Sequence, residues 1–380
     1  MSKLVRFDTD NLIYNRFDLI YKEGNHTISY CDSDANYCLD IHTEGTNAKI
    51  NIWGKPLPQE IFDKAVWDVF SDQRICAIEL TRCKNPYGGF LEEVNDIRVP
   101  LPGDFEELMN RAERRDRATI RRKLRWLDER VGELKIEAYT RNAIPEHVVE
   151  TYFQWKKETH GTDYRLSASE YLDRYYVTDA MLMKAGDTEV AVAFFCQAED
   201  IVFFENFSYN TALKEYSPGL LMYVKLMEEL IKRKCRYLYL GGGSYIYKKR
   251  FGAEASLAYS GTIYRKEIMD GIDAFFQEKN IDSAAFYGYG VCGHSFLLLS
   301  KNLALSVCYG IDRKVTDGEN VKIYAPEDEL PEADAVLITL NNKDEEVEKA
   351  LAARFEKVYY WNYILEKIIG EYQRRIDEGA

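Results

Sequence analysis

The chain has 380 residues, which is enough for two or three domains with cores of their own. Hydrophobic residues make up 46% and charged residues 30% of the sequence, a composition that excludes wholesale disorder. The net charge of −13 argues against a general nucleic-acid surface, because such binding depends on neutralising phosphates, and we therefore expect no DNA partner.

Residues 1–130 form the first of three predicted domains. The predicted elements are strands at 49–53 and 75–80, a helix at 58–70 and a long helix at 104–131. Asp104 is a suitable N-cap for the long helix, because its side chain can accept a hydrogen bond from a first-turn amide. Gly132 is a suitable stop.

Residues 131–267 form the second predicted domain, which mixes strands and helices. The predicted elements are, in chain order, strand 134–140, helices 145–158 and 167–176, strands 180–185, 188–197 and 201–209, helix 220–235, and strands 236–240 and 258–265. Ser167 and Glu170 have the spacing of a capping box, which supports the start of the second helix.

Residues 280–380 form the third predicted domain. Strands at 283–287, near 312, at 335–340 and at 358–361 alternate with helices. Such alternation predicts a small, doubly wound parallel sheet of the Rossmann-like kind. The fold class expected for the whole chain is therefore α/β.

Other classes of site and location have little support in the sequence. No apolar run approaches the roughly 18 residues of a membrane span, and the first residues lack the apolar core of a signal peptide. We therefore expect a cytoplasmic protein. The eight cysteines and five histidines show no metal-ligand spacing, so we expect neither a zinc site nor a disulfide framework.

The most informative segment is 188–252. Two strands are followed by Ser217-Pro218-Gly219, which opens a helix, and the next strand ends in three glycines at 241–243. The start of a helix carries unpaired backbone amides and a positive potential, so it is a generic anion site. Proline and glycine are also compatible with an ordinary helix start that binds nothing.

This order of elements resembles that of the GNAT acyltransferase superfamily. The runs YSPGLL at 216–221, YLYLGGG at 237–243 and YKKRFG at 247–252 are similar to the FemAB-like acetyltransferases, a group that includes the CelD/BcsL type. The likeness covers about residues 30–265. It implies two GNAT-like repeats, of which the first is degenerate, and acetyl-CoA or another acyl-CoA as the donor.

The resemblance also implies a place for the carrier. In GNAT enzymes the helix after the fourth strand caps the pyrophosphate of the carrier, and here that position falls on Ser217, Gly219 and Leu220. The usual motif of the superfamily is richer in basic residues and glycines than residues 214–219.

Three residues are candidates for catalysis. Glu205 lies in an apolar strand, which would raise its pKa and suit a general base, and it matches the strand that supplies the base in several GNAT enzymes. Tyr247 could protonate the leaving thiolate, and Lys248 could stabilise the oxyanion. The alternatives are a solvent-facing strand residue at 205 and a solvated helix face at 248–250.

Basic residues supply the candidates for substrate binding: Lys249, Arg250, Arg121 and Arg122. The last two belong to a basic run at 111–125, whose Ile120, Leu124 and Leu127 give it an apolar stripe. This run is either the exposed face of a helix between domains or a groove for an anionic substrate.

The third domain contains an intact G-x-G-x-x-G at Gly288, Gly290 and Gly293, between a strand and a helix. Asp312 lies 19 residues beyond the last glycine, at the end of the next strand. This is the context of a dinucleotide fingerprint. The domain is similar to small Rossmann-like units attached to sugar-modifying acyltransferases, which implies a nucleotide ligand, NAD or a nucleotide sugar. A purely structural role is the alternative.

These features together predict an acyl-CoA-dependent N-acyltransferase that acts on an amino group of a sugar, a nucleotide sugar or a cell-surface glycan precursor. Direct transfer is favoured because no Cys/His pair in a motif is present. One alternative is a Fem-type peptidoglycan transferase that uses aminoacyl-tRNA, although the acidic charge disfavours tRNA. A second alternative is a non-catalytic nucleotide sensor.

Overall fold

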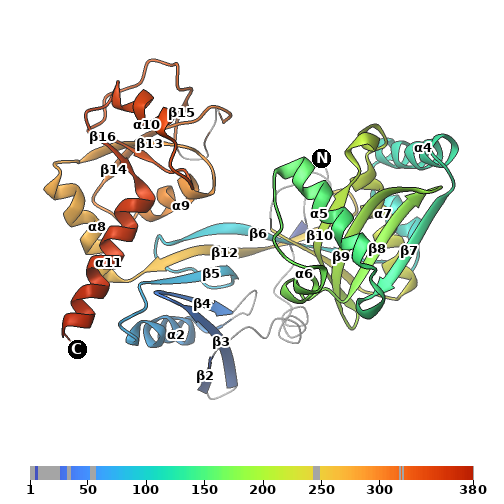
Figure 1. Ribbon diagram of the computed structural model, residues 1–380. Coiled ribbons are helices and arrows are strands. Elements are labelled where there is room, and N and C mark those ends of the chain that lie inside the picture. Colours follow the sequence, from blue (N-terminus) through green and yellow to red (C-terminus); the bar gives the residue numbers. More distant parts are fainter. Residues whose placement is uncertain are drawn as a thin grey trace. The chain divides into compact units, whose positions relative to one another are not determined.

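Figure 1 shows a computed structural model of the chain, which describes residues 5–6, 26–31, 36–51, 57–242, 249–315, 318 and 321–379. The described residues form two compact units. The first unit comprises those in 1–22 and 94–258, and the second comprises those in 23–93 and 259–380.

The units are discontinuous in sequence because two strands pass through both of them. β6 (Leu91–Pro100) and β12 (Glu254–Tyr264) each contain a boundary between the units. The division into domains 1–130, 131–267 and 280–380 stays a prediction about independently folding parts. The predicted α/β class is confirmed by a large mixed sheet with helices and by a separate parallel sheet near the C-terminus.

The first unit is built on a mixed sheet with the order β12-β6-β11-β10-β9-β8-β7. Its other strands are β7 (Leu134–Thr140), β8 (Asp179–Ala185), β9 (Thr188–Ala198), β10 (Ile201–Tyr209) and β11 (Tyr237–Gly241). β7 to β10 form an antiparallel meander, whereas β10 and β11 run parallel. The short strand β1 (Val5–Arg6) pairs with β12.

Helices cover both faces of this sheet. One face packs on α3 (Phe105–Arg111), α4 (Arg114–Arg130) and α7 (Pro218–Lys232), and the other on α5 (Glu146–His160) and α6 (Ala168–Arg174). The short helices η1 (Arg141–Ala143) and η2 (Thr211–Tyr216) complete the unit. Coverage on both sides explains why β8 and β9 read as continuous apolar runs instead of alternating ones.

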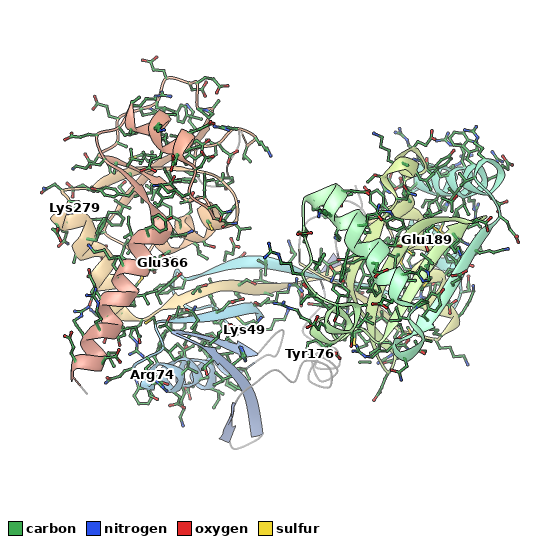
Figure 2. The ribbon with its side chains drawn as sticks, viewed as in Figure 1. Lys49, Arg74, Tyr176, Glu189, Lys279 and Glu366 are labelled. Carbon is green, nitrogen blue, oxygen red and sulfur yellow. The ribbon has the colours of Figure 1, made fainter. Side chains whose placement is uncertain are left out.

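Successive residues of β8 show how the two faces divide. Met181 and Met183 belong to the core under α7, whereas Ala180 and Leu182 belong to the core under α5 and α6. Near the start of β9, Glu189, which is labelled in Figure 2, accepts a hydrogen bond from Thr151 Oγ1 of α5 at 3.0 Å. The capping box predicted at Ser167 is confirmed, with both of its hydrogen bonds formed.

The single long helix predicted at 104–131 is wrong. Asp104 does cap the first turn, but the helix ends at Arg111, because Ala112 adopts an extended conformation with φ −75° and ψ 152°. Arg117 Nη1 donates to the carbonyls of Asn110 and Ala112 at 3.1 and 3.0 Å, which satisfies the end of α3. α4 then starts afresh and lies along α7.

The second unit contains two sheets. The first has the order β2-β3-β4-β5-β12, with β2 (His26–Cys31), β3 (Asn36–Glu44), β4 (Asn47–Asn51) and β5 (Ala77–Cys83). It packs on α2 (Gln59–Ser71), close to the helix predicted at 58–70. β2, β3 and β6 were not predicted. In β3 the buried residues Leu39 and Ile41 alternate with polar residues, and this short alternation was not recognised as a strand.

The second sheet has the order β15-β14-β13-β16-β17 and is parallel throughout. Its strands are β13 (Ser283–Tyr287), β14 (Ser306–Ile311), β15 (Ile323–Tyr324), β16 (Ala335–Ile338) and β17 (Val358–Tyr360). One face packs on α8 (Lys266–Glu278), α9 (Val291–Ser300) and α11 (Trp361–Gly379), and the other on α10 (Glu345–Ala352). The predicted parallel sheet is therefore confirmed. Among the described helices, none has the length and apolar character to cross a membrane.

A buried ion pair ties β6 to β12 in the first unit. Arg98 Nε donates to Glu254 Oε2 at 2.8 Å, and the Arg98 side chain is only 6% exposed. Its guanidinium also lies 4.4 Å from the centre of the Tyr237 ring on β11. The pair therefore fixes the strand beside β11.

We predict that Glu254→Gln lowers the free energy of unfolding by about 1–3 kcal/mol, because Arg98 keeps its charge in a buried site without its counter-ion. Urea unfolding followed by circular dichroism measures the change. Glu150→Gln on the exposed side of α5 is the matched control and should change stability by less than about 0.5 kcal/mol. Equal effects of the two variants would show that the ion pair contributes nothing.

Candidate active site

The parallel strands β10 and β11 pair over only three residues. Residues 201–203 oppose residues 237–239, and the ladder then ends. Beyond that point β10 continues to pair with β9 as far as Tyr209, while β11 pairs with β6 as far as Gly241. Beyond residues 203 and 239 the two strands no longer pair with each other, and such a parting of parallel strands is a place where an extended ligand can add hydrogen bonds like a strand.

A β-bulge lies where the two strands part. The register between β10 and β9 shifts between Phe204 and Asn206, which makes Glu205 the extra residue. Bulges bend a strand and re-aim a side chain, and they are frequent beside active sites. The backbone therefore puts the predicted base two residues past the last pair of the ladder. The side chain of Glu205 is outside the described residues, so its role as a base stays a prediction.

Tyr223 of α7 lies under the opening between the strands. Its ring centre is 6.3 Å from that of Phe204 on β10 and 5.9 Å from that of Phe251, which follows β11. Phe204 in turn stacks on Phe207 with a centre distance of 5.5 Å. Aromatic side chains therefore support the region where the hydrogen-bond ladder is missing. In the sequence, Tyr223 is not distinguishable from the other apolar positions of this helix, so it was not predicted as a site residue.

The start of α7 is unusual for a helix N-terminus. Ser217 precedes Pro218 in the left-handed conformation, with φ 57° and ψ 54°, which is uncommon for a residue with a side chain. Its hydroxyl caps no amide of the helix. The amides of Leu220 and Leu221 both donate to the Ser217 carbonyl, whereas no partner of the Gly219 amide is found among the described residues.

A lysine occupies this helix start. Lys123 Nζ of α4 donates to Ser217 Oγ at 2.5 Å and to the Glu215 carbonyl at 2.9 Å, and its side chain is half-buried. A cation is electrostatically unfavourable at the positive end of a helix dipole. The arrangement becomes favourable when an anion binds between the ammonium group and the first-turn amide. Lys123 belongs to the segment 121–124, which fits the FemAB-like resemblance, but it was not among the predicted site residues.

The other residues of the predicted carrier site pack closely against β10. A Cβ added to Gly219 would lie 3.0 Å from the Phe207 ring and 3.3 Å from the Tyr209 ring, so the glycine lets the helix start approach the strand. Leu220 is half-buried. Ser217, Gly219 and Leu220 thus lie together at the start of α7, beside the strand that carries the bulge, and their binding role stays a prediction.

The predicted substrate-binding cations have partners within the protein. Arg121 pairs with Glu106 at 2.8 Å, and both side chains are well exposed. Arg122 and Arg130 both stack on the ring of Trp126, at 4.9 and 4.8 Å. These contacts account for much of the basic helix without a ligand.

The tail after β11 carries the remaining candidates. Arg250 pairs with Asp116 of α4 at 3.4 Å, and Lys249 beside it is half-buried. Tyr247 and Lys248 lie outside the described residues, so the roles of proton donor and oxyanion stabiliser stay predictions.

The glycine motif of the second unit forms the turn between β13 and α9. Gly288 has φ +102°, a conformation that favours glycine. A Cβ on Gly293 would lie 2.1 Å from the Gly288 carbonyl oxygen, so only glycine allows that close approach. Gly290 differs from both, because its φ is −91° and a Cβ added there meets nothing within 4 Å.

Asp312 lies beside this turn at the end of β14. Its Oδ2 accepts from the Tyr289 amide at 2.7 Å, and its Oδ1 accepts from the Lys314 and Val315 amides at 2.7 and 3.1 Å. Burial opposes ionisation of this carboxyl group, but the three amides outweigh it and hold the pKa below the usual 3.8. Asp312 therefore ties the glycine turn to the loop after β14.

Part of the first unit matches a known protein family. Residues 114–249 match the family described as acetyltransferase (GNAT) domain. This range begins at α4 and includes β10, the bulge, α7 and β11. A search of curated protein sequences found no match for the chain.

Three solved structures are among those similar to the chain. FemX is 11% identical, with 63% of this chain and 87% of that chain covered and a TM-score of 0.45. The C-terminal domain of a putative lysylphosphatidylglycerol synthetase from Agrobacterium fabrum is 12% identical, with 67% and 91% covered and a TM-score of 0.43. A GCN5-related N-acetyltransferase from Kribbella flavida is 13% identical, with 66% and 94% covered and a TM-score of 0.40. Since no score reaches 0.5, no activity is inferred from these likenesses.

The glycine turn yields a paired prediction. Gly293→Ala should lower the free energy of unfolding by about 1–3 kcal/mol, because the added methyl group meets a backbone oxygen that cannot move aside without strain. Gly290→Ala, three residues away, should leave stability within about 0.5 kcal/mol of the parent, since its Cβ meets open space. Thermal unfolding followed by calorimetry compares the two. A similar loss in both variants would contradict this geometry of the turn.

Proposed function

We propose that this protein is an acyl-CoA-dependent N-acyltransferase that passes an acyl group directly from a thioester to an amine. The observation that carries the proposal is the parting of β10 and β11 beside a helix start that holds Lys123. The match of residues 114–249 to the GNAT acetyltransferase domain supports the same conclusion.

The place where β10 and β11 part suits the pantetheine arm of coenzyme A. That arm contains two amide groups in an extended chain, which can pair with main-chain groups as an added strand would. The edge of β10 between Phe204 and Tyr209 leads from the bulge to η2 and then to the start of α7. A donor lying along this edge would have its thioester near the bulge and its pyrophosphate near the helix start.

The helix start suits the pyrophosphate. The Gly219 amide and the Lys123 ammonium group offer a hydrogen bond and a positive charge to an anion at this place. Coenzyme A is the donor that this arrangement supports best, and acetyl-CoA is its simplest acyl form.

Direct transfer needs a base and no covalent enzyme intermediate. The amine nitrogen attacks the thioester carbon, the carbon–sulfur bond breaks, the base takes the proton of the amine, and a proton donor protonates the thiolate. We assign the base to Glu205, the proton donor to Tyr247 and oxyanion stabilisation to Lys248. The described cysteines of this unit, Cys196 and Cys235, are buried, and burial raises the pKa of Cys235 to about 11. A thiol with that pKa is a poor nucleophile at neutral pH.

The acceptor is assigned by resemblance alone. It is an amino group on a sugar, a nucleotide sugar or a cell-surface glycan precursor. A panel of amino sugars and UDP-linked amino sugars, with acetyl-CoA as the donor and release of the CoA thiol as the signal, identifies the acceptor. No turnover with any amine, together with no binding of acetyl-CoA, would overturn the proposed function.

We predict that Glu205→Gln lowers kcat by 10²- to 10⁴-fold, because the isosteric amide cannot take the proton of the amine. The dissociation constant for acetyl-CoA, measured by calorimetry, should stay within about twofold of the parent value, since the carrier site is unchanged. A variant that keeps full turnover would exclude Glu205 as the base.

We predict that Lys123→Met weakens acetyl-CoA binding roughly tenfold, because a charge-assisted hydrogen bond to phosphate contributes about 1.5–3 kcal/mol. Dephospho-coenzyme A keeps the pyrophosphate but lacks the 3′-phosphate. Lys123→Met should therefore weaken the binding of dephospho-coenzyme A by the same factor as that of acetyl-CoA. Arg125→Met is the matched control on α4, where Arg125 is exposed and, among the described residues, forms a salt bridge only with Glu129, and it should leave binding unchanged. Equal effects of the two variants would indicate a general role of the basic helix instead.

A further inference from the structure

A cavity of about 350 Å³ lies at the carboxyl ends of the parallel strands in the second unit. The glycine turn after β13, the loop after β14 and the loop after β16 line it. From β13 the chain passes through α9 to β14, which pairs with one edge of β13. β16 pairs with the opposite edge of β13. Crevices at such a reversal of strand order are the usual ligand sites of open parallel sheets.

The acidic and basic side chains that line the cavity differ in their hydrogen-bond and ion-pair partners. Both carboxylates are already bonded to backbone amides: Asp312 to three of them, and Asp344 to those of Glu346 and Val347 at 3.1 Å each. The cations Arg313 and Lys314 are exposed, and neither makes a salt bridge within the part of the chain that the structure describes. Arg313 does hydrogen bond to Tyr287, and the Lys314 side chain acts on Asp312 through its charge alone. The cavity therefore offers two exposed cations, whereas both of its carboxylates are held by amides.

Backbone donors face the same place. For the amides of Gly290, Val291, Cys292 and Gly293, no hydrogen-bond partner is found among the described residues, and the N-cap Gly290 supplies no side chain for them. α9 has ten residues, long enough for an appreciable dipole. The first-turn amides, whose partial charges form the positive end of the dipole, and the two cations are two separate contributions to binding an anion.

Gly290 lies at a position where a side chain would have room. The folded chain gives reasons for glycine at 288 and 293, but none at 290, where a side chain would meet open space. Without a Cβ at this position, the backbone at the start of α9 stays open to close approach by a ligand. A phosphate group that comes into contact with the backbone is such a ligand.

We propose that this cavity binds the pyrophosphate of a nucleotide, with the phosphates on the first-turn amides of α9 and the side chains of Arg313 and Lys314 beside them. Val291 is 82% exposed at the cavity and offers an apolar contact for the rest of the ligand. Asp312 positions the turn through its three amides. This inference concerns a second site and does not depend on the acyltransferase proposal.

Calorimetry on the full chain tests the proposal with named probes. UDP, ADP and NAD⁺ distinguish a nucleoside diphosphate from a dinucleotide, and uridine and adenosine are the controls without phosphate. At least one pyrophosphate compound should bind at least tenfold more tightly than the nucleosides, and its affinity should fall with added salt. No binding of any of these probes, or equal binding of nucleoside and nucleotide, would overturn the proposal.

Two variants locate the site. Gly290→Val should weaken nucleotide binding at least tenfold because it fills the place of the phosphate, and the Arg313→Gln/Lys314→Gln double variant should weaken it similarly. Gly103→Val is the matched control, since a Cβ at Gly103 also meets open space, and it should bind as the parent does. Thermal unfolding confirms that each variant is folded.

Acetyl-CoA also contains a pyrophosphate, so it is titrated into the same variants. Its binding should be unchanged in Gly290→Val if its site is at α7. A loss of acetyl-CoA binding in Gly290→Val with none in Lys123→Met would overturn the proposed carrier site and leave the nucleotide cavity standing. Unchanged nucleotide binding in Gly290→Val would overturn the cavity and leave the carrier site standing.

Discussion

The loss of pairing between β10 and β11 is the constraint on which the candidate active site depends. Their ladder ends after Phe203 and Tyr239, and each strand then follows its outer neighbour. The bulge at Glu205, the aromatic contacts of Tyr223 and the start of α7 all lie around the place where the strands part. The proposed binding and chemistry both depend on this one local departure from regular sheet structure.

Local patterns predicted most of the fold. Strand 134–140 matches β7, and strand 201–209 matches β10, because continuous or alternating apolar runs bounded by turn residues are strong signals. The predicted helix at 104–131 failed at Ala112, where tertiary packing buries an extended residue inside a run with good helix propensity. β3 was missed although Leu39 and Ile41 alternate with polar residues in the pattern of a half-buried strand.

The candidate site was predictable only in part. Ser217, Gly219 and Leu220 carry a local signal, since Pro and Gly mark a helix start. For Lys123 the basic run of α4 gives no hint of its place at α7, because the contact that matters joins it to a residue 94 positions away. Likewise, the glycine spacing pointed to the turn at 288–293, but only the structure showed that Asp312 is held by three amides, while two neighbouring cations have no salt bridge to any residue that the structure describes. Long-range contacts of this kind depend on the fold and leave no pattern in a single sequence.

Amide hydrogen exchange of the full chain, with and without acetyl-CoA, tests the central claim most directly. If the pyrophosphate binds at the start of α7 and the arm lies along β10, acetyl-CoA should slow exchange in peptides that cover 204–222. Peptides that cover 288–294 should be unaffected. Protection confined to 288–294, or no protection anywhere at saturating acetyl-CoA, would contradict the assignment of the carrier site to the parted strands.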